Sequence, residues 1–144
     1  MSRSKNIKKV LRESKRSRKE TVRAYTVSLA VPASIIDNAQ SLELKTYLVA
    51  QIAKAASIFG VNELIIISDD KNAQMKGMMT GLTTTDFFAQ NLEYLETPPY
   101  LRMKLFQKSP ALRFSGMMNP ADAPHHMNMG EWSAFREGVV IKRP

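Results

Sequence analysis

Cysteine is absent from the 144-residue chain, which excludes disulfides and thiolate metal sites and leaves two histidines as candidate metal ligands. The absence of cysteine also fits a reducing compartment. No apolar run approaches the roughly 20 residues of a membrane-spanning helix, and the N-terminus lacks the apolar core of a secretory signal peptide. We therefore expect a soluble, intracellular protein with no membrane partner.

Glycine is also scarce, with six residues, and no glycine-rich phosphate or nucleotide loop follows either of the strands predicted below. No Ser-His-Asp or Cys-His pair has a persuasive setting, and no pair of carboxylates stands out as general acid and base. The sequence therefore assigns no catalytic residue and no metal site. A hydrophobic content of 44% is nevertheless sufficient for a sizeable core.

Positive charge is concentrated at the N-terminus. Residues 1–23 carry ten Lys or Arg and two Glu, a net charge of +8, whereas residues 24–144 carry eleven of each sign. We expect residues 1–23 to form a disordered basic tail and residues 24–144 to form the folded domain. Such a tail attracts RNA phosphates and resembles nuclear localisation signals, although it could also be a solvated arm. Its candidate RNA contacts are Lys8, Lys9, Arg12, Lys15, Arg16, Arg18 and Lys19.

A βαβ unit with a parallel sheet is predicted at the start of the domain, which makes the fold class α/β. Thr26–Val31 alternates as a strand does, and a helix capped by Asp37 or Asn38 should end at Gly60. The apolar run in Glu63–Ser68 indicates a second strand, covered on both faces. The buried face of the helix is expected to consist of Leu44, Leu48, Ile52, Ala55 and Phe59.

The remaining segments alternate between helical patterns and proline-rich breaks. A second helix should begin at Thr85 or Asp86 and end at the Thr97-Pro98-Pro99 break. A short basic helix is predicted over Tyr100–Phe106. Ser109–Met129 should be irregular but ordered, and Glu137–Arg143 is predicted to be a last short strand.

Several polar and aromatic residues in these segments are candidates for a site. Asp69 and Asp70 follow the second strand, where α/β sheets place ligands, or they simply begin a polar loop. His125 and His126 are chain neighbours, expected to point in different directions, which makes them a poor metal pair. They suit structural hydrogen bonds, or contact with substrate or RNA. Trp132 and Phe135 are interpreted as packing residues, with stacking on a base as the alternative.

Several stretches together resemble a known family. VPASIIDNAQSLELKTYLVAQIAKAASIFGVNELIII, NLEYLETPPYLRMKLF, LRFSGMMNPADAPHHM and FREGVVIKRP occur in this order. They resemble the N-terminal half of putative RNA methyltransferases of the SPOUT class, in a eukaryotic and archaeal subgroup that carries an OB-like insertion. The resemblance covers nearly everything after the basic tail.

The resemblance implies an α/β fold whose C-terminal part is tied in a trefoil knot that binds S-adenosylmethionine. Family members act as dimers on RNA. The chain has no counterpart of the knot or its glycine-rich loops, so we expect a partial SPOUT fold with the knot missing. Full-length relatives would use S-adenosylmethionine, but this chain alone would bind no cofactor and transfer no methyl group. Its expected partners are ribosomal RNA and either a second copy or another chain that completes the fold, in the nucleus or nucleolus.

The expected role of this part is to face the RNA. Asp37 and Asn38 follow the first strand at its carboxyl end, although they could equally serve as helix caps. His125 and His126 could border the substrate. Phosphate contacts are predicted for Arg102, Lys104, Arg113 and Arg136. The alternative function is a non-enzymatic RNA-binding or ribosome-assembly module, and a third possibility is a poorly folding fragment with an unpaired sheet edge.

Overall fold

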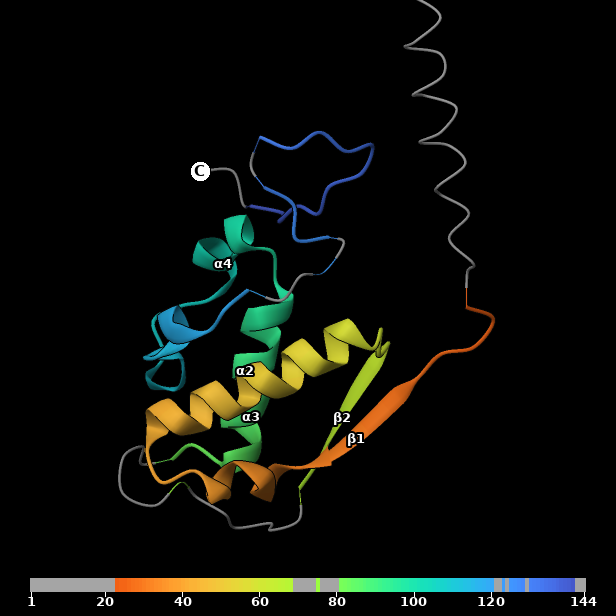
Figure 1. The fold of residues 1–144 in the computed structure, drawn as a ribbon. Coiled ribbons are helices and arrows are strands. Elements are labelled where there is room, and N and C mark those ends of the chain that lie inside the picture. Colours follow the sequence, from red (N-terminus) through yellow and green to blue (C-terminus); the bar gives the residue numbers. More distant parts are fainter. Residues whose placement is uncertain are drawn as a thin grey trace, which may run out of the picture.

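Two parallel strands joined by a helix form the centre of the protein, which is described here by a computed structural model (Figure 1). The structure describes residues 23–68, 75, 81–120, 123, 125–128 and 130–141. The predicted tail contacts and Asp69 and Asp70 lie outside these residues. Strand β1 (Ser28–Pro32) pairs in parallel with β2 (Glu63–Ile67). The predicted βαβ unit is therefore confirmed.

The helix between the strands begins later than the sequence predicted. Residues Ala33–Asn38 form a 3₁₀ helix, η1, and α2 covers Leu42–Ile58. The N-cap of α2 is Ser41, whose hydroxyl accepts a hydrogen bond from the Leu44 amide at 3.2 Å. Asp37 and Asn38 were therefore the wrong cap residues. Ser41 has the same capping chemistry and stands directly before the helix, whereas the earlier pair belongs to a separate turn.

The end of α2 was predicted correctly. Gly60 follows the C-cap residue Phe59 and has a φ of +61°, a left-handed conformation that favours glycine. Arg23 closes this end, because its guanidinium donates to the carbonyl oxygens of Gly60 at 2.9 Å and Phe59 at 3.2 Å. A cation is stabilised at a helix C-terminus by the exposed carbonyl groups and the helix dipole. The first residue of the described chain is therefore fixed to α2.

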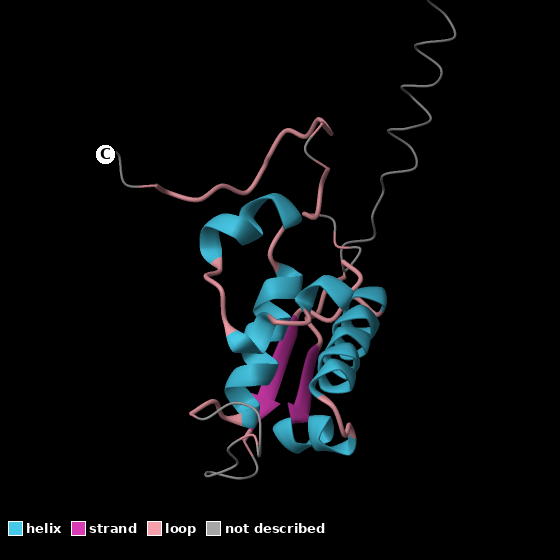
Figure 2. Ribbon diagram, turned by 90° about the vertical axis from the view of Figure 1, so that its left-hand side faces the viewer, coloured by secondary structure: helices cyan, strands magenta, loops and turns pink. Residues whose placement is uncertain are grey.

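The sheet is covered on one face only, contrary to the sequence prediction. In the parallel register Ala30 pairs with Ile65 and Pro32 with Ile67, and these four side chains are exposed. The neighbouring pairs alternate to the opposite face, where Val31 is buried. Figure 2 shows the two strands edge to edge among the helices. A continuous apolar run predicts burial on both faces only when further elements cover the second face.

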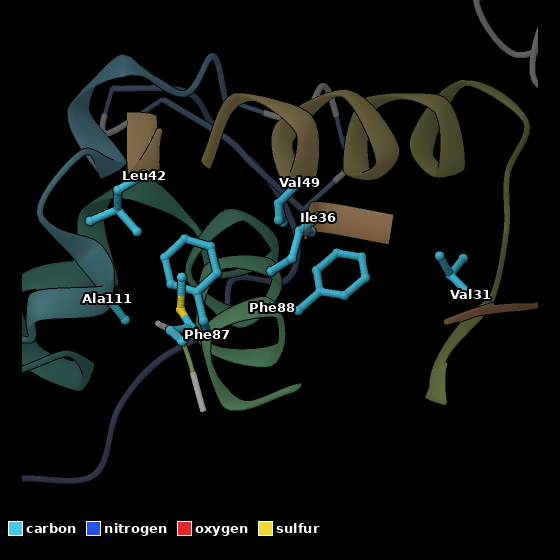
Figure 3. Packing of buried hydrophobic residues seen from close by; sticks show 8 residues of the cluster. Val31, Ile36, Leu42, Val49, Phe87, Phe88 and Ala111 are labelled. Atoms are coloured by element: carbon cyan, nitrogen blue, oxygen red, sulfur yellow. The ribbon is translucent and has the colours of Figure 1, made fainter. Parts of the chain in front are cut away.

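The hydrophobic core lies between α2, η1 and α3 (Thr84–Glu96). Figure 3 shows Phe87 and Phe88 of α3 packed below Ile36 and Val49. On α2 the buried residues are Leu42, Thr46 and Val49.

The helical face predicted to be buried on α2 is only partly correct, because Ile52 packs against the core and Leu48 is half-buried. Leu44, Ala55 and Phe59 of that set are exposed, as are the neighbouring Tyr47 and Ile58. The helix has apolar residues on more than one side, and periodicity alone does not say which side faces the core.

The segments after α3 extend the helical part of the fold. Thr83 caps α3, and the helix ends at Glu96, with Thr97 of the predicted break as its C-cap. The short helix α4 (Pro99–Leu105) follows, then the 3₁₀ turns η2 (Pro110–Leu112) and η3 (Ser115–Met117). Buried Asn91 ties α3 to η2, because its amide donates to the Ala111 carbonyl at 3.2 Å.

The last predicted strand is absent from the part of Glu137–Arg143 that the structure describes, residues 137–141. These residues have no strand partner there, and Val140 is 99% exposed. None of the helices in the described part of the chain has the length and apolar character of a membrane span.

We predict that Gly60→Ala lowers the free energy of unfolding by about 1 kcal/mol, because a left-handed conformation is unfavourable for residues with a Cβ. The added Cβ would also lie 3.0 Å from a guanidinium nitrogen of Arg23. Thermal unfolding followed by circular dichroism measures the change. The matched control is Gly116→Ala, where nothing lies within 4 Å of the new Cβ. Equal stability of both variants would contradict the prediction.

Candidate functional site

The structure does not bring the predicted RNA-binding residues together in one place. Asp37 and Asn38 belong to η1, at the carboxyl end of β1, whereas α4 lies beyond the C-terminal end of α3 (Figure 1). Asp37 accepts a hydrogen bond from the Lys45 ammonium at 2.6 Å, so its charge is compensated within the chain. Asn38 is exposed. The two ends therefore do not form one site.

Three of the predicted residues, Arg102, His125 and His126, contact carbonyl oxygens at the C-terminal end of α3. Arg102 donates through Nε to the Thr97 carbonyl at 2.9 Å and through a terminal nitrogen to the Leu95 carbonyl at 3.2 Å. Its guanidinium also lies 4.7 Å from the centre of the Tyr94 ring. These contacts satisfy carbonyl groups that have no partner within the helix. Arg102 therefore closes α3, and its half-buried charge is used inside the protein.

His125 and His126 meet at the same helix end. Nε2 of His125 lies 3.0 Å from the Glu96 carbonyl oxygen and 3.2 Å from a carboxylate oxygen of Glu96. Nε2 of His126 also contacts the Glu96 carbonyl. The two rings meet edge to face, with centroids 4.5 Å apart. The expectation that they point in different directions is wrong, because both rings turn to the unsatisfied end of the helix.

These contacts match the structural role that the sequence left open for the histidines. Each Nε2 must carry its proton to donate to a carbonyl oxygen. Among the described residues, no three side chains from His, Asp and Glu come together as metal ligands would.

Arg136 lies close to α4, where Tyr100 joins it to the helix. Its guanidinium lies 5.3 Å from the centre of the Tyr100 ring and donates to the carbonyl oxygens of Asn128 at 2.9 Å and Glu131 at 3.0 Å. The Tyr100 hydroxyl donates to the Glu137 carbonyl at 3.1 Å. Arg136 thus holds the C-terminal segment against α4.

The other two predicted cations are accessible to a ligand. Lys104 is exposed on α4. Arg113 is also exposed, with its guanidinium 5.5 Å from the Phe114 ring centre. They belong to a stretch, residues 97–121, that contains four basic residues and no acidic one. We call this stretch the basic segment. It can attract an anionic polymer by its excess charge.

A cleft of about 580 Å³ opens between the C-terminal halves of α2 and α3, at the start of β2. Its walls are small and apolar, including Ala53, Ala56 and Ala89. Its charged residues are Glu63, Glu93 and Glu96, together with His125 as a titratable group. No lysine or arginine lines it among the residues described. The cleft therefore disfavours phosphate groups.

S-adenosylmethionine, the donor implied by the resemblance, finds only part of what it needs in this cleft. The donor carries an α-carboxylate that needs a cation or free backbone N–H groups. The N–H groups of residues 59–63 already donate within the chain, to carbonyls of Ala55, Ser57, Ala56 and Val27. The cleft thus offers three glutamates to the cationic ammonium and sulfonium groups of the donor, but no described lysine or arginine to its carboxylate. We derive no methyl-transfer step from the described residues.

Glu96 and Tyr100 organise this end of the molecule, and neither was predicted as a site residue. The proline break after Thr97 was visible and implied a helix end with unsatisfied carbonyl groups. The later donors that can reach those groups are Arg102 and the two histidines. The stacking of Arg136 on Tyr100 joins residues 36 positions apart, and no local pattern encodes it.

Comparison with known proteins gives a consistent family match. The family model described as "Putative RNA methyltransferase" matches residues 26–144. The chain is 47% identical over 128 residues to a human 28S rRNA (uridine-N(3))-methyltransferase. This alignment covers 85% of the chain and 34% of the relative. The chain is 40% identical over 131 residues to the Drosophila melanogaster protein of the same name, covering 82% and 27%. It is also 37% identical over 161 residues to a putative methyltransferase from Caenorhabditis elegans, covering 96% and 43%. The chain thus spans about a third of the length of these relatives.

We predict different roles for the two cations of α4. Arg102→Ala should lower the free energy of unfolding by about 2 kcal/mol, because it removes charged hydrogen bonds to the end of α3. Lys104→Ala, on the exposed side of the same helix, should change it by less than about 0.5 kcal/mol. Urea unfolding of both variants measures the difference. A similar loss in each would show that Arg102 does not close α3.

Proposed function

Because the chain belongs to the family of putative RNA methyltransferases, we propose that residues 24–144 form the RNA-facing part of an enzyme that methylates ribosomal RNA. The observation that carries this proposal is the match over residues 26–144, together with 47% identity to a relative named for 28S rRNA. The basic segment supports it, because its three exposed cations, Lys104, Lys108 and Arg113, suit contact with RNA phosphates.

The proposed fold is the SPOUT class, and the proposed donor is S-adenosylmethionine, which supplies an electrophilic methyl group when it is bound. The donor site would lie outside the residues described here. The role of this part would then be to hold the RNA so that the target base reaches the donor, since positioning of reactants lowers the barrier to transfer.

The basic tail supports the same proposal. Its net charge of +8 over residues 1–23 can add non-specific affinity for RNA through release of counterions. This charge pattern also suits import into the nucleus, and we propose a nuclear or nucleolar location, where ribosomal RNA is made.

Two uncovered apolar surfaces suggest how the fold is completed. One is the open sheet face that contains Ile65 and Ile67. We propose that further chain, as in the longer relatives, covers it. The other is the outer stripe of α2, which we define as Leu44, Tyr47, Ile58 and Phe59. These residues recur at helical spacing on one side, and we propose that the stripe joins two copies in a homodimer.

A second candidate function is a non-enzymatic RNA-binding or ribosome-assembly module. The exposed cations Lys104, Lys108 and Arg113 are compatible with it, because they can contact RNA phosphates whether or not methyl transfer follows. The two functions differ in whether methyl transfer depends on this segment. Replacing the matched segment of a relative by this one can therefore distinguish the two functions.

We predict that a hybrid of the human relative, with its matched 128-residue segment replaced by the corresponding part of this chain, methylates 28S rRNA. Its rate should stay within about tenfold of the parent, or about 1.4 kcal/mol in the barrier. Transfer of a labelled methyl group to the RNA measures it. The control hybrid carries Phe88→Ala, which removes a fully buried core side chain and should abolish transfer.

A folded hybrid that binds S-adenosylmethionine and RNA but transfers no methyl group would contradict the enzyme proposal and favour the module. Residues 1–144 alone should show no rise in melting temperature with S-adenosylmethionine, since a ligand that binds the folded state raises that temperature. Such a rise would place a donor site in this chain.

We predict that Leu44→Lys combined with Ile58→Lys converts a dimer into a monomer, because it puts two charges into the outer stripe of α2. Sedimentation velocity over a range of concentrations measures the change. Gln107→Lys with Asn119→Lys adds the same charge at exposed positions elsewhere and should leave the dimer intact. A monomeric wild-type protein at all concentrations would exclude this interface.

A further inference from the structure

The only tryptophan of the chain lies on the surface. Trp132 is 88% exposed and Phe135 is 89% exposed, so their interpretation as packing residues is wrong within the described part of the chain. Large aromatic side chains usually contribute burial to a core or to an interface. Two of them three residues apart, both facing solvent, indicate that this stretch contacts something outside the described residues.

The residues that carry these rings are held in place by a set of hydrogen bonds. We call residues 130–137 the Trp132 loop. Arg136 donates to the carbonyl oxygens of Asn128 and Glu131, and the Glu131 amide donates to the Asn128 carbonyl at 3.1 Å. The Asn128 amide in turn donates to a Glu131 carboxylate oxygen at 3.3 Å. The chain therefore closes on itself on both sides of Trp132.

The loop is also attached to a basic helix. Tyr100 of α4 contacts Arg136 through its ring and Glu137 through its hydroxyl. Figures 1 and 2 both show this segment beyond α4, away from the sheet. The loop therefore lies beside α4, which carries the exposed Lys104, while Glu131 and Glu137 of the loop itself are exposed carboxylates.

We propose that Trp132 and Phe135 form a stacking platform for unpaired bases of single-stranded RNA. This inference rests on the proposed function and names how the RNA would be recognised. Aromatic side chains beside a positively charged surface are the usual means of holding unpaired bases, because every base has a face that can stack. The basic segment would contact the phosphates of the same strand, which matches their charge.

Arg136 acts in this arrangement as a positioning residue. Its guanidinium is used to close the loop and to stack on Tyr100, which keeps the two exposed rings in a fixed segment. The predicted phosphate contact of Arg136 is therefore assigned instead to the exposed lysines of the basic segment. A fixed platform binds more tightly than a flexible one because less freedom is lost when the RNA arrives.

The test uses the fluorescence of Trp132, which reports this position alone because the chain has no other tryptophan. The full chain is titrated with a single-stranded oligouridine 12-mer and with a blunt RNA duplex of equal length. We expect strong quenching by the single strand and little by the duplex. The anisotropy of the labelled RNA gives the affinity in the same titration.

Variants separate stacking from general RNA binding. Trp132→Ala should weaken binding of the single strand about tenfold, and Trp132→Phe should restore most of it, since one stacked base contributes roughly that amount. The matched control is Val140→Ala, which removes a fully exposed aliphatic side chain and should change affinity less than about twofold. The melting temperature of all three should equal that of the wild type because the side chains are exposed.

The outcomes distinguish this inference from the proposed function. RNA binding without quenching, and unchanged by Trp132→Ala, would overturn the platform and leave the proposed function standing. No binding of either RNA would contradict both. A blue shift of the emission that grows with protein concentration, without RNA, would show that the rings pack against a second copy and would overturn the platform.

Discussion

The carbonyl groups at the C-terminal end of α3 are the constraint on which the outer half of the structure depends. A helix end cannot leave these groups without donors when they are shielded from water. Arg102 reaches back from α4, and His125 and His126 reach them from the following irregular segment. The same contacts set the position of α4 and of the histidine segment relative to the core. Through Tyr100, α4 then holds the Trp132 loop.

Residues close to each boundary predicted where most helices and strands begin and end. Which of their faces are buried depends on elements far away in the sequence. The βαβ unit, the end of α2 at Gly60 and the end of α3 before the prolines follow from residues close to each boundary. The N-cap at Ser41 was missed because Asp37 offers similar chemistry a few residues earlier. The burial of α2 and of β2 was missed because an apolar residue is buried only if another element covers it. Leu44 and Ile65 have no such partner among the described residues.

The candidate site shows the same division. The sequence identified most of the charged residues at the end of α3, but it assigned Arg102 and Arg136 to phosphate contacts. The structure shows both guanidinium groups hydrogen-bonded within the chain, and leaves Lys104 and Lys108 exposed. Negative and positive charges also occupy different parts of the fold. Three glutamates line the cleft, whereas the basic segment contains no acidic residue. Under the proposed function, an RNA strand would be repelled from the cleft and attracted towards α4.

The attachment of Arg23 to Phe59 and Gly60 determines where the basic tail leaves the domain. It does so at the amino ends of the strands, on the same side of the fold as the C-terminal end of α3 (Figure 1). The 22 residues before Arg23 can span at most about 75 Å. Under the proposed function, RNA contacts of α4 and of the tail sequence would start from the same side of the fold, so binding at one would favour binding at the other. Two weak contacts on one chain, one from the tail and one from α4, would then bind with a higher combined affinity than either contact alone.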